Sequence, residues 1–416
     1  MRLFFSVGEP SGDLHGSNLI RRFQTTDPDI ECVGFGGPKM AEAGCDLHYD
    51  LTQKAVMFLK EVIGELKFFF SLVDQADEYF ANNEVDAVVL IDYPGFNWWI
   101  AKKAKARGIP VFYFGVPQMW AWAPWRVRKM RKFVDHALCK LPFEVDWFKK
   151  RNVEATYVGH PYFDQLDRQS YDGLFLDSQK GKQLITLLPG SRNREVESNL
   201  PTLVRSAQLI AKSCPGTSFA VASANKKQME MAQTIINEIK SECEDEFPSI
   251  ELHVDRTPEL MVSATACMAC SGSVSLELMH HRKPTVIVYK MGRMISLAQI
   301  ALMRTRFMTL VNLIAVKDIA KKSWLPADPD SGSECAQLMV MPEYLSTGDV
   351  SAPAANQIIN WLKNPDQLQK NVEQLDALAV KYAKPGAVVT AADYILQTLG
   401  NANAVPNAEV DRTRAA

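Results

Sequence analysis

The sequence predicts an α/β protein in two halves that each alternate parallel strands with helices, and three observations support this. Aliphatic runs typical of buried parallel strands recur along the chain, each followed by a turn of small or acidic residues and then a helical pattern. This alternation occurs before and after a polar segment at 167–183 with the composition of a linker. A length of 416 residues suggests two to three domains. We therefore expect domains at 1–170 and 171–379, a last helix, and a disordered tail at 401–416.

Composition excludes several classes of protein. The chain is 47% hydrophobic and 23% charged with a net charge of −2, so no overall positive field recruits nucleic acid. Cys267 and Cys270 form the only C-x-x-C, in an apolar run without a second pair, which argues against a zinc or redox site. The apolar run at 3–7 is too short for a signal peptide, and no run approaches the ~18 residues of a membrane-spanning helix. We expect a cytoplasmic protein.

The first half begins with a strand at 3–7, a small acidic loop at 8–16 and a helix. This is a nucleotide-fold unit, but it lacks the dinucleotide fingerprint G-x-G-x-x-G. The clearest strand, 85–91, ends at Asp92, and ligands of open α/β sheets gather at such strand ends. Asp92 is therefore a candidate functional residue; the alternative is an Asp that caps the following Pro-Gly turn. Strands at 111–114 and 136–141 follow.

Two stretches of the first half are rich in aromatic residues. Residues 55–72 are helical by pattern but carry more apolar side chains than one core-facing stripe needs, including Phe68, Phe69 and Phe70. Farther on, three tryptophans precede a basic run: Trp120, Trp122, Trp125, Arg126, Arg128, Lys129, Arg131 and Lys132. Such stretches suit a lipid substrate or an anionic membrane surface. The alternatives are a well-packed helix, core tryptophans beside a solvated face, or nucleic-acid binding.

The second half opens with a strand at 183–188 that runs into Gly190, Ser191 and Arg192, then a helix to about residue 211. Ser191 and Asn193 are both candidate helix caps. Backbone N–H groups at such a turn point toward a space where an anion can bind, and the Arg192 guanidinium suits phosphate oxygens. The alternative is an ordinary loop with a surface arginine.

The same arrangement occurs again later in this half, after strands at 218–222 and 250–254. A strand at 266–270 ends in Ser271, Gly272 and Ser273, with Glu277 one helical turn inside the next helix. Glu277 stands about a nucleotide's length from the loop, where a carboxylate can take ribose hydroxyls. Two anion-seeking loops in one domain predict a nucleotide diphosphate site. A strand at 285–289 follows, and Asn312 is either a satisfied core amide or a ligand contact.

Several motifs in consistent order resemble the lipid A disaccharide synthase family. They are Gly8-Glu-Pro-Ser-Gly-Asp, Ile91-Asp-Tyr-Pro-Gly-Phe-Asn, Trp120-Ala-Trp, Val158-Gly-His-Pro, Leu188-Pro-Gly-Ser-Arg with Arg194-Glu-Val, and Ser271-Gly-Ser with Leu276-Glu. The resemblance covers about residues 1–320. It implies a GT-B architecture with two Rossmann-like, doubly wound domains facing a cleft, the last helix, about 380–400, crossing back to the first domain.

The resemblance also implies a reaction and its partners. The family transfers 2,3-diacylglucosamine from UDP-2,3-diacylglucosamine to 2,3-diacylglucosamine 1-phosphate with inversion. The products are the β-1,6 disaccharide 1-phosphate and UDP. It works as a peripheral protein on the inner face of the inner membrane of Gram-negative bacteria and needs no cofactor and no metal at the donor site. The sequence does not decide between a monomer and a homodimer.

The resemblance further implies roles for residues. Asp92 or Glu9 would be the base that deprotonates the acceptor hydroxyl, the other acid binding or orienting the acceptor. The loops at Gly190–Arg192 and Ser271–Ser273 would hold the UDP diphosphate. Glu277 would bind the ribose, and Asn312 would contact a further part of the donor. The aromatic and basic positions Phe68, Phe69, Phe70, Trp120, Trp122, Arg126 and Arg128 would meet the acyl chains and the membrane.

The chain departs from the family pattern at three places. Pro10 replaces a small residue, 321–340 reads as an insertion, and Ser346 stands where Gln is usual. Two rival functions remain open: a UDP-sugar epimerase of the same architecture, and a non-catalytic nucleotide sensor at a membrane surface. The aromatic clusters count against the epimerase, and a sensor would not need Asp92.

Overall fold

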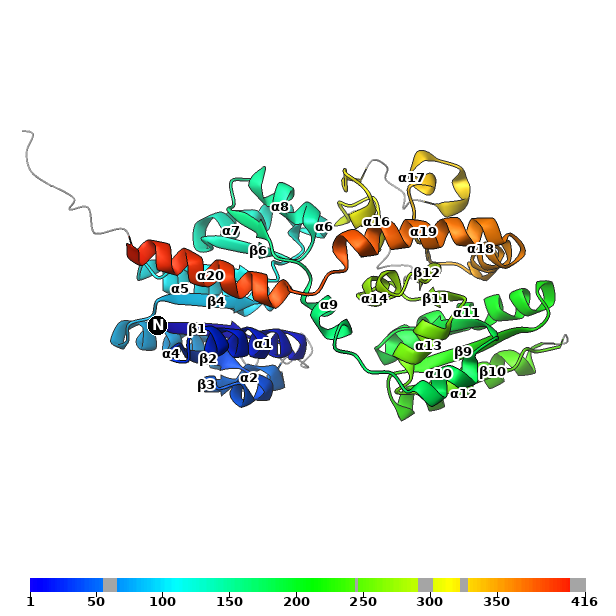
Figure 1. The fold of residues 1–416 in the computed structure, drawn as a ribbon, viewed down its shortest axis with the longest axis horizontal. Coiled ribbons are helices and arrows are strands. Elements are labelled where there is room, and N and C mark those ends of the chain that lie inside the picture. The colour runs from blue at the N-terminus through cyan, green and yellow to red at the C-terminus, as the bar shows by residue number, and fades with distance from the viewer. Residues whose placement is uncertain (55–65, 244–245, 291–301, 322–327, 405–416) are drawn as a thin grey trace, which may run out of the picture. The chain divides into compact units, whose positions relative to one another are not determined.

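The computed structural model describes residues 1–54, 66–243, 246–290, 302–321 and 328–404. The chain divides into two compact units (Figure 1). Unit 1 comprises Met1–Asp164 and Pro385–Ala416, and unit 2 comprises Gln165–Lys384. The division therefore lies at 164/165, where we expected 170/171.

Unit 1 contains a seven-stranded parallel sheet in the order β3-β2-β1-β4-β5-β6-β7. Its strands are β1 Arg2–Val7, β2 Glu31–Gly36, β3 Asp46–Asp50, β4 Ala87–Ile91, β5 Val111–Phe114, β6 His136–Cys139 and β7 Ala155–Tyr157. Its helices include α1 Pro10–Thr26, α2 Pro38–Glu42, α4 Leu66–Asn82, α5 Pro94–Ala106, α6 Met119–Trp122, α7 Val127–Phe133, α8 Pro142–Lys149, α9 Pro161–Leu166, which reaches into unit 2, and α20 Ala387–Ala404.

Helices cover both faces of this sheet because successive strand residues point to opposite sides. Phe4, Val88 and Tyr113 pack with α4, α5, α7 and α8 in one buried cluster. Phe5 and Phe112, on the other face, pack with α1, α2 and α20. The unit is therefore doubly wound, as the sequence predicts.

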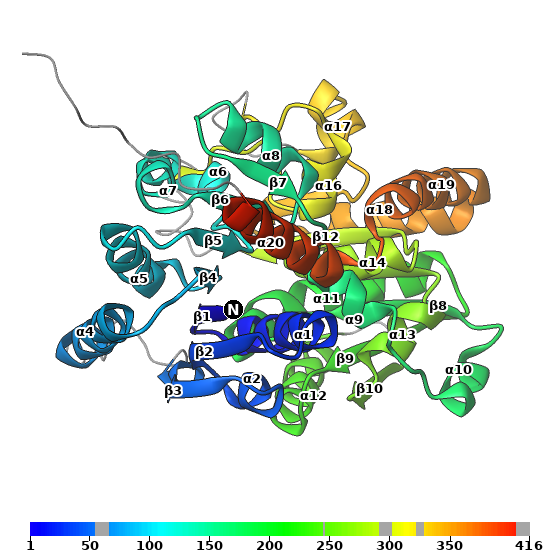
Figure 2. The same cartoon turned by 60° about the vertical axis from the view of Figure 1, so that its left-hand side comes forward.

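The last helix, α20, completes unit 1. It lies beside α1 in both views (Figures 1 and 2). The Asp164 carboxylate accepts hydrogen bonds from the backbone N–H groups of Gly386 and, at 3.0 Å, of Val388. Gly159 has φ +91°, a conformation that other residues rarely adopt, and its Cα faces Ala387 of α20. Helix α20 is described to Ala404, and residues 405–416 of the expected tail lie outside the described residues.

Unit 2 contains a six-stranded parallel sheet in the order β10-β9-β8-β11-β12-β13. Its strands are β8 Gln183–Leu188, β9 Thr217–Ser223, β10 Ile250–Val254, β11 Ala266–Ala269, β12 Thr285–Lys290 and β13 Glu343–Ser346. Its helices include α10 Gly173–Gln179, α11 Asn193–Ser213, α12 Lys226–Ser241, α13 Thr257–Ser263, α14 Val274–His280, α16 Leu310–Ala315, α17 Glu334–Gln337, α18 Ser351–Lys363 and α19 Pro365–Tyr382.

Unit 2 also has helices on both faces of its sheet. Ile185 and Leu187 of β8 pack in a cluster with α11, α12 and α18. Thr186 points to the opposite face, where its hydroxyl donates to the Leu260 carbonyl of α13 at 2.9 Å. The predicted fold class of two parallel-sheet α/β domains is confirmed. No helix among the described residues is long and apolar enough to cross a membrane.

Candidate active site

The first group of candidate residues lies at the carboxyl edge of the unit 1 sheet. Val7 of β1 is in register with Ile91 of β4, so the loops that follow leave the sheet side by side. A Cβ at Gly8 would overlap the Tyr93 ring. Glu9 is the exposed N-cap of α1, and Pro10 follows where a helix accepts proline without losing a hydrogen bond. The structure thus places Glu9 and Asp92 on neighbouring loops.

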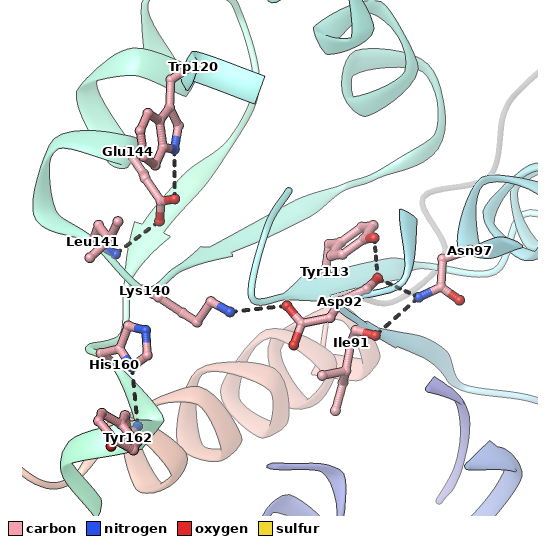
Figure 3. Close-up of polar contacts among 10 residues, drawn as sticks. All are labelled: Ile91, Asp92, Asn97, Tyr113, Trp120, Lys140, Leu141, Glu144, His160 and Tyr162. Carbon is pink, nitrogen blue, oxygen red and sulfur yellow. Dashed lines mark hydrogen bonds and ion pairs between the residues drawn. The ribbon is translucent and has the colours of Figure 1, made fainter. Parts of the chain in front are cut away.

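The backbone at Asp92 is unusual. Asp92 and Tyr93 have φ values of +45° and +41°, in the left-handed region that non-glycine residues rarely adopt. Two side chains hold the Asp92 carbonyl oxygen: the Tyr113 hydroxyl donates at 2.5 Å and the Asn97 amide at 2.9 Å (Figure 3). Asn97 is itself fixed by Ser6, whose hydroxyl donates to Asn97 Oδ1 at 2.6 Å. Such over-determined strain is characteristic of functional sites.

The Asp92 carboxylate forms an ion pair with Lys140, the first residue after β6. Lys140 Nζ lies 3.0 Å from Asp92 Oδ1, and the two side chains are 19% and 22% exposed (Figure 3). Among the described residues, Asp92 Oδ2 has no hydrogen-bond partner. One carboxylate oxygen is thus anchored and the other is open. No local pattern in the sequence marks Lys140, because its pairing with Asp92 depends on which strands are neighbours.

Two neutral histidines lie near this ion pair. Burial, and then the charge of Lys140, lowers the pKa of His15 to about 4. Burial and Lys140 also hold the pKa of His160 well below its usual value. His160 Nδ1 accepts from the Tyr162 backbone N–H at 3.2 Å. The site therefore combines a carboxylate, an ammonium group and two uncharged imidazoles.

The second group lies on unit 2, at the loop between β8 and α11. The backbone N–H groups of Ser191 and Arg192 donate to Glu195 Oε2 at 2.9 and 3.2 Å, and Arg192 Nη1 lies 3.1 Å from Oε1. Glu195 thus caps the helix, and the expectation that Ser191 or Asn193 caps it with its own side chain is wrong. Gly190 has φ +131°, and a Cβ there would collide with Glu195. The loop therefore already binds a carboxylate.

The second anion-seeking loop lies on the adjacent strand. Leu188 of β8 is in register with Ala269 of β11, and the Cys270 N–H donates to the Leu188 carbonyl at 2.8 Å. Both loops therefore leave the same edge of the sheet. Ser271 is half-buried while Gly272 and Ser273 are exposed.

Glu277 lies in α14, next to the second loop, and is 6% exposed. Burial raises the pKa of Tyr171, and the negative charge of Glu277 raises it further. The structure thus places Glu277 on the helix that the Ser271–Ser273 loop begins, as the spacing predicts; its contact with a ribose stays a prediction.

Asn312 fits the core interpretation rather than the donor-contact one. Its side chain is fully buried in α16. Oδ1 accepts from the backbone N–H groups of Val340 and Met341 at 2.9 Å, and Nδ2 donates to the Met341 carbonyl at 2.7 Å and to Glu343 at 3.3 Å. The amide thus has no spare donor or acceptor for a ligand, and it anchors the segment leading into β13.

Trp120 is a core residue, which corrects its assignment to the membrane-facing set. It is 3% exposed, and its indole N–H donates to the buried Glu144 carboxyl at 2.9 Å (Figure 3). Burial raises the pKa of Glu144 to about 7. The indole would have to leave this partner to reach a lipid.

Other aromatic and basic positions remain at the surface of unit 1. Trp122 and Trp125 are 53% and 58% exposed, and the Arg126 guanidinium lies 4.8 Å from the Trp122 ring centre. Phe68 and Phe69 are half-buried against the core, whereas Phe70 is exposed and makes an edge contact with the exposed Trp99. Arg128 is exposed on α7. Residues 55–65 of the expected aromatic helix lie outside the described residues.

Comparison with known proteins decides the family. The model of the lipid-A-disaccharide synthetase family matches residues 3–331. The chain belongs to this family. It is 33% identical over 326 residues to the lipid-A-disaccharide synthase of Trichlorobacter lovleyi, covering 77% of this chain and 83% of the relative. The enzyme of the same name from Coxiella burnetii is 32% identical over 318 residues, covering 76% and 82%.

Solved structures show the same fold at low identity. The UDP-GlcNAc 2-epimerase of Neisseria meningitidis bound to UDP-GlcNAc aligns with a TM-score of 0.57 at 12% identity, covering 96% of this chain and all of that one. MurG of Acinetobacter baumannii aligns with a TM-score of 0.54 at 11% identity, covering 95% and 99%. The predicted GT-B fold class is thereby confirmed, and at this identity the similarity concerns the fold alone.

Proposed function

We propose that this chain joins two acylated glucosamines in lipid A biosynthesis. As a member of its family it is an enzyme, a UDP-sugar-dependent glycosyltransferase. It transfers 2,3-diacylglucosamine from UDP-2,3-diacylglucosamine to O6 of 2,3-diacylglucosamine 1-phosphate, releasing UDP. Within this fold, the observation that carries the proposal is the geometry of Asp92. Its backbone at the end of β4 is strained, Lys140 binds one oxygen of its carboxylate, and the other oxygen has no partner among the described residues.

Unit 1 supplies the proton acceptor in this proposal. Asp92 Oδ2 takes the proton from the acceptor 6-hydroxyl while O6 attacks C1 of the donor sugar from the face opposite UDP. The C1–O bond to UDP breaks with its electron pair on the diphosphate, so the configuration inverts. Glu9, on the neighbouring loop, orients the acceptor. The fixed Asp92 backbone supports this role because a base must be held within hydrogen-bonding reach of its proton.

Unit 2 supplies the donor site. The N–H groups of Ser191 and Arg192 bind the diphosphate in place of the Glu195 carboxylate, with the Arg192 guanidinium balancing the charge that develops on departing UDP. Gly190 permits the turn, and Ser271, Gly272 and Ser273 contribute the second loop. Glu277 takes the ribose hydroxyls. The first loop already binds the Glu195 carboxylate through its backbone N–H groups, which supports an anion site there.

The lipid-facing part of the proposal concerns exposed residues of unit 1. Trp122, Trp125, Phe70 and Trp99 offer apolar area, and Arg126, Arg128, Lys129, Arg131 and Lys132 offer positive charge. Tryptophan and arginine both favour the headgroup zone of a bilayer. We therefore propose a peripheral association with an anionic membrane, where both acylated substrates reside.

A turnover assay tests the proposal. Purified protein receives both substrates in detergent, and UDP release is followed together with disaccharide formation. Equal amounts of the two products support the transferase.

A second candidate, a UDP-sugar epimerase, is favoured only by the shared fold. Interconversion of an acyl-free UDP-sugar without disaccharide would favour the epimerase, and UDP binding without either reaction would favour a sensor.

A further inference from the structure

We propose that Lys140 is a positioning residue for Asp92, holding Oδ1 so that Oδ2 faces the acceptor hydroxyl. This inference rests on the proposed function and adds a residue to it. Lys140 Nζ and Asp92 Oδ1 lie 3.0 Å apart, and both side chains are about four-fifths shielded from solvent. A shielded pair is less screened than a surface one, so its geometry is held more firmly.

The backbone of a third strand passes close to this pair. Lys140 follows β6 and Asp92 follows β4, so the lysine must cross the end of β5, which lies between them. Gly115, the residue after β5, has φ +72°, and a Cβ there would lie 3.0 Å from both Asp92 Oδ1 and Lys140 Nζ. A side chain at Gly115 would therefore crowd both charged groups, which would have to move by a few tenths of an ångström.

The other titratable and charged groups around the pair come from several elements: Glu9 and His15 of the α1 region, Tyr93, Tyr113 of β5, Arg126, and His160 after β7. Burial and the charge of Lys140 lower the pKa of His15 to about 4 and hold the pKa of His160 well below its usual value, so both are neutral near pH 7. Arg126 acts on Tyr113 electrostatically. Within the described part of the chain, Lys140 is thus the cation paired with Asp92.

An ammonium group beside a base has two opposing effects. It favours the ionised carboxylate, which extends the range of acidic pH over which the base is ready to act. It also makes the carboxylate a weaker proton acceptor. Because Lys140 contacts only Oδ1, Oδ2 stays available to accept a hydrogen bond from a substrate hydroxyl. The pH profile of turnover is therefore the property that Lys140 should control.

A matched ion pair at the opposite edge of the same sheet supplies the control. Lys105 Nζ lies 2.7 Å from Asp135 Oδ1, with side chains 32% and 33% exposed. Asp135 precedes β6 and accepts the N–H of Val111 at the start of β5, so this pair lies at the amino ends of the strands. Lys105→Met removes a comparable charge without touching the carboxyl edge.

The experiment measures kcat/KM against pH for the unsubstituted protein, Lys140→Met, Lys140→Arg and Lys105→Met. We expect the acid limb to move up by about one pH unit in Lys140→Met. Lys140→Arg should restore it at least in part, and Lys105→Met should leave it in place. An unmoved limb in Lys140→Met would overturn the inference. So would a rise in the KM of the acceptor alone, which would make Lys140 a substrate contact.

A second measurement does not depend on turnover. Carbodiimide activates protonated carboxyls, so loss of the unmodified Asp92 peptide, followed by mass spectrometry against pH, reports protonation of Asp92 directly. Its midpoint should rise in Lys140→Met and stay in place in Lys105→Met; equal midpoints would overturn the inference even if a variant is inactive. Failure of the unsubstituted protein to form disaccharide would instead refute the proposed function.

Discussion

Replacing Arg192 by Ala should separate donor binding from folding. The Arg192 side chain is 83% exposed, and its pair with Glu195 spans three positions of one helix end. Such a surface pair contributes at most about 0.5 kcal/mol to stability, so the thermal midpoint should hardly change. A charge-assisted hydrogen bond to a phosphate contributes about 1.5–3 kcal/mol, which raises the Kd for UDP by roughly 10- to 150-fold.

Isothermal titration calorimetry with UDP measures this change, and the thermal midpoint is recorded on the same samples. Lys240→Ala, an exposed cation at the far end of α12 in the same unit, is the matched control for a lost positive charge. A Kd for Arg192→Ala within about threefold of the control would place the diphosphate elsewhere. A lowered thermal midpoint would mean that the loop, not the contact, was lost.

Three further predictions follow from the unit 1 site. Asp92→Asn should lower kcat by about 100-fold or more while leaving UDP affinity unchanged, and a kcat near the wild-type value would exclude Asp92 as the base. Asn97→Ala removes the hydrogen bonds of a fully buried amide to Ser6 and Asp92, so it should destabilise unit 1 by about 2 kcal/mol and also reduce kcat. A thermally unchanged, fully active variant would contradict the anchoring role. The pKa of His15 is lowered from 6.5 to about 4, so the folded state binds fewer protons than the unfolded state in that window and stability is lost as pH falls through it. His15→Leu should flatten the dependence of the thermal midpoint on pH between 6.5 and 4, and an unaltered slope would show that this imidazole does not contribute.

Local patterns in the sequence were enough to predict the strand ends at which the candidate site residues lie. A continuous aliphatic run ending in a polar residue marks Asp92, and small residues after a strand mark the loops at Gly190 and Ser271. Strands β2, β3, β7 and β13 were not predicted. β2 is an inner strand whose apolar run is interrupted by Gly34 and Gly36, and β7 is an edge strand of only three residues. β3 and β13 are edge strands of partial burial, so their composition alternates too little to stand out from a loop.

Features that depend on tertiary neighbours could not be predicted. Lys140 faces Asp92 only because β5 alone lies between β4 and β6, which no local spacing records. Trp120 and Trp122 sit two positions apart in a helix of four residues, and the sequence does not tell which of them points inward. The sequence alone does not tell whether the Asn312 amide binds a ligand or stabilises the core, because its partners at Met341 lie 29 positions away in the chain.

The place of α20 in unit 1 has a consequence for how the chain is made. Val388, Ala391 and Ile395 of this helix complete the same apolar cluster as Phe112 and Leu138 in the sheet. During synthesis the part of that face that α20 covers, beside α1, stays exposed until the ribosome has passed residues 387–404, after all of Gln165–Lys384 has emerged. Domains usually finish folding in the order in which they are translated. Here the first unit to begin is the last to be completed, and a nascent chain stalled before residue 387 presents apolar surface to chaperones and proteases.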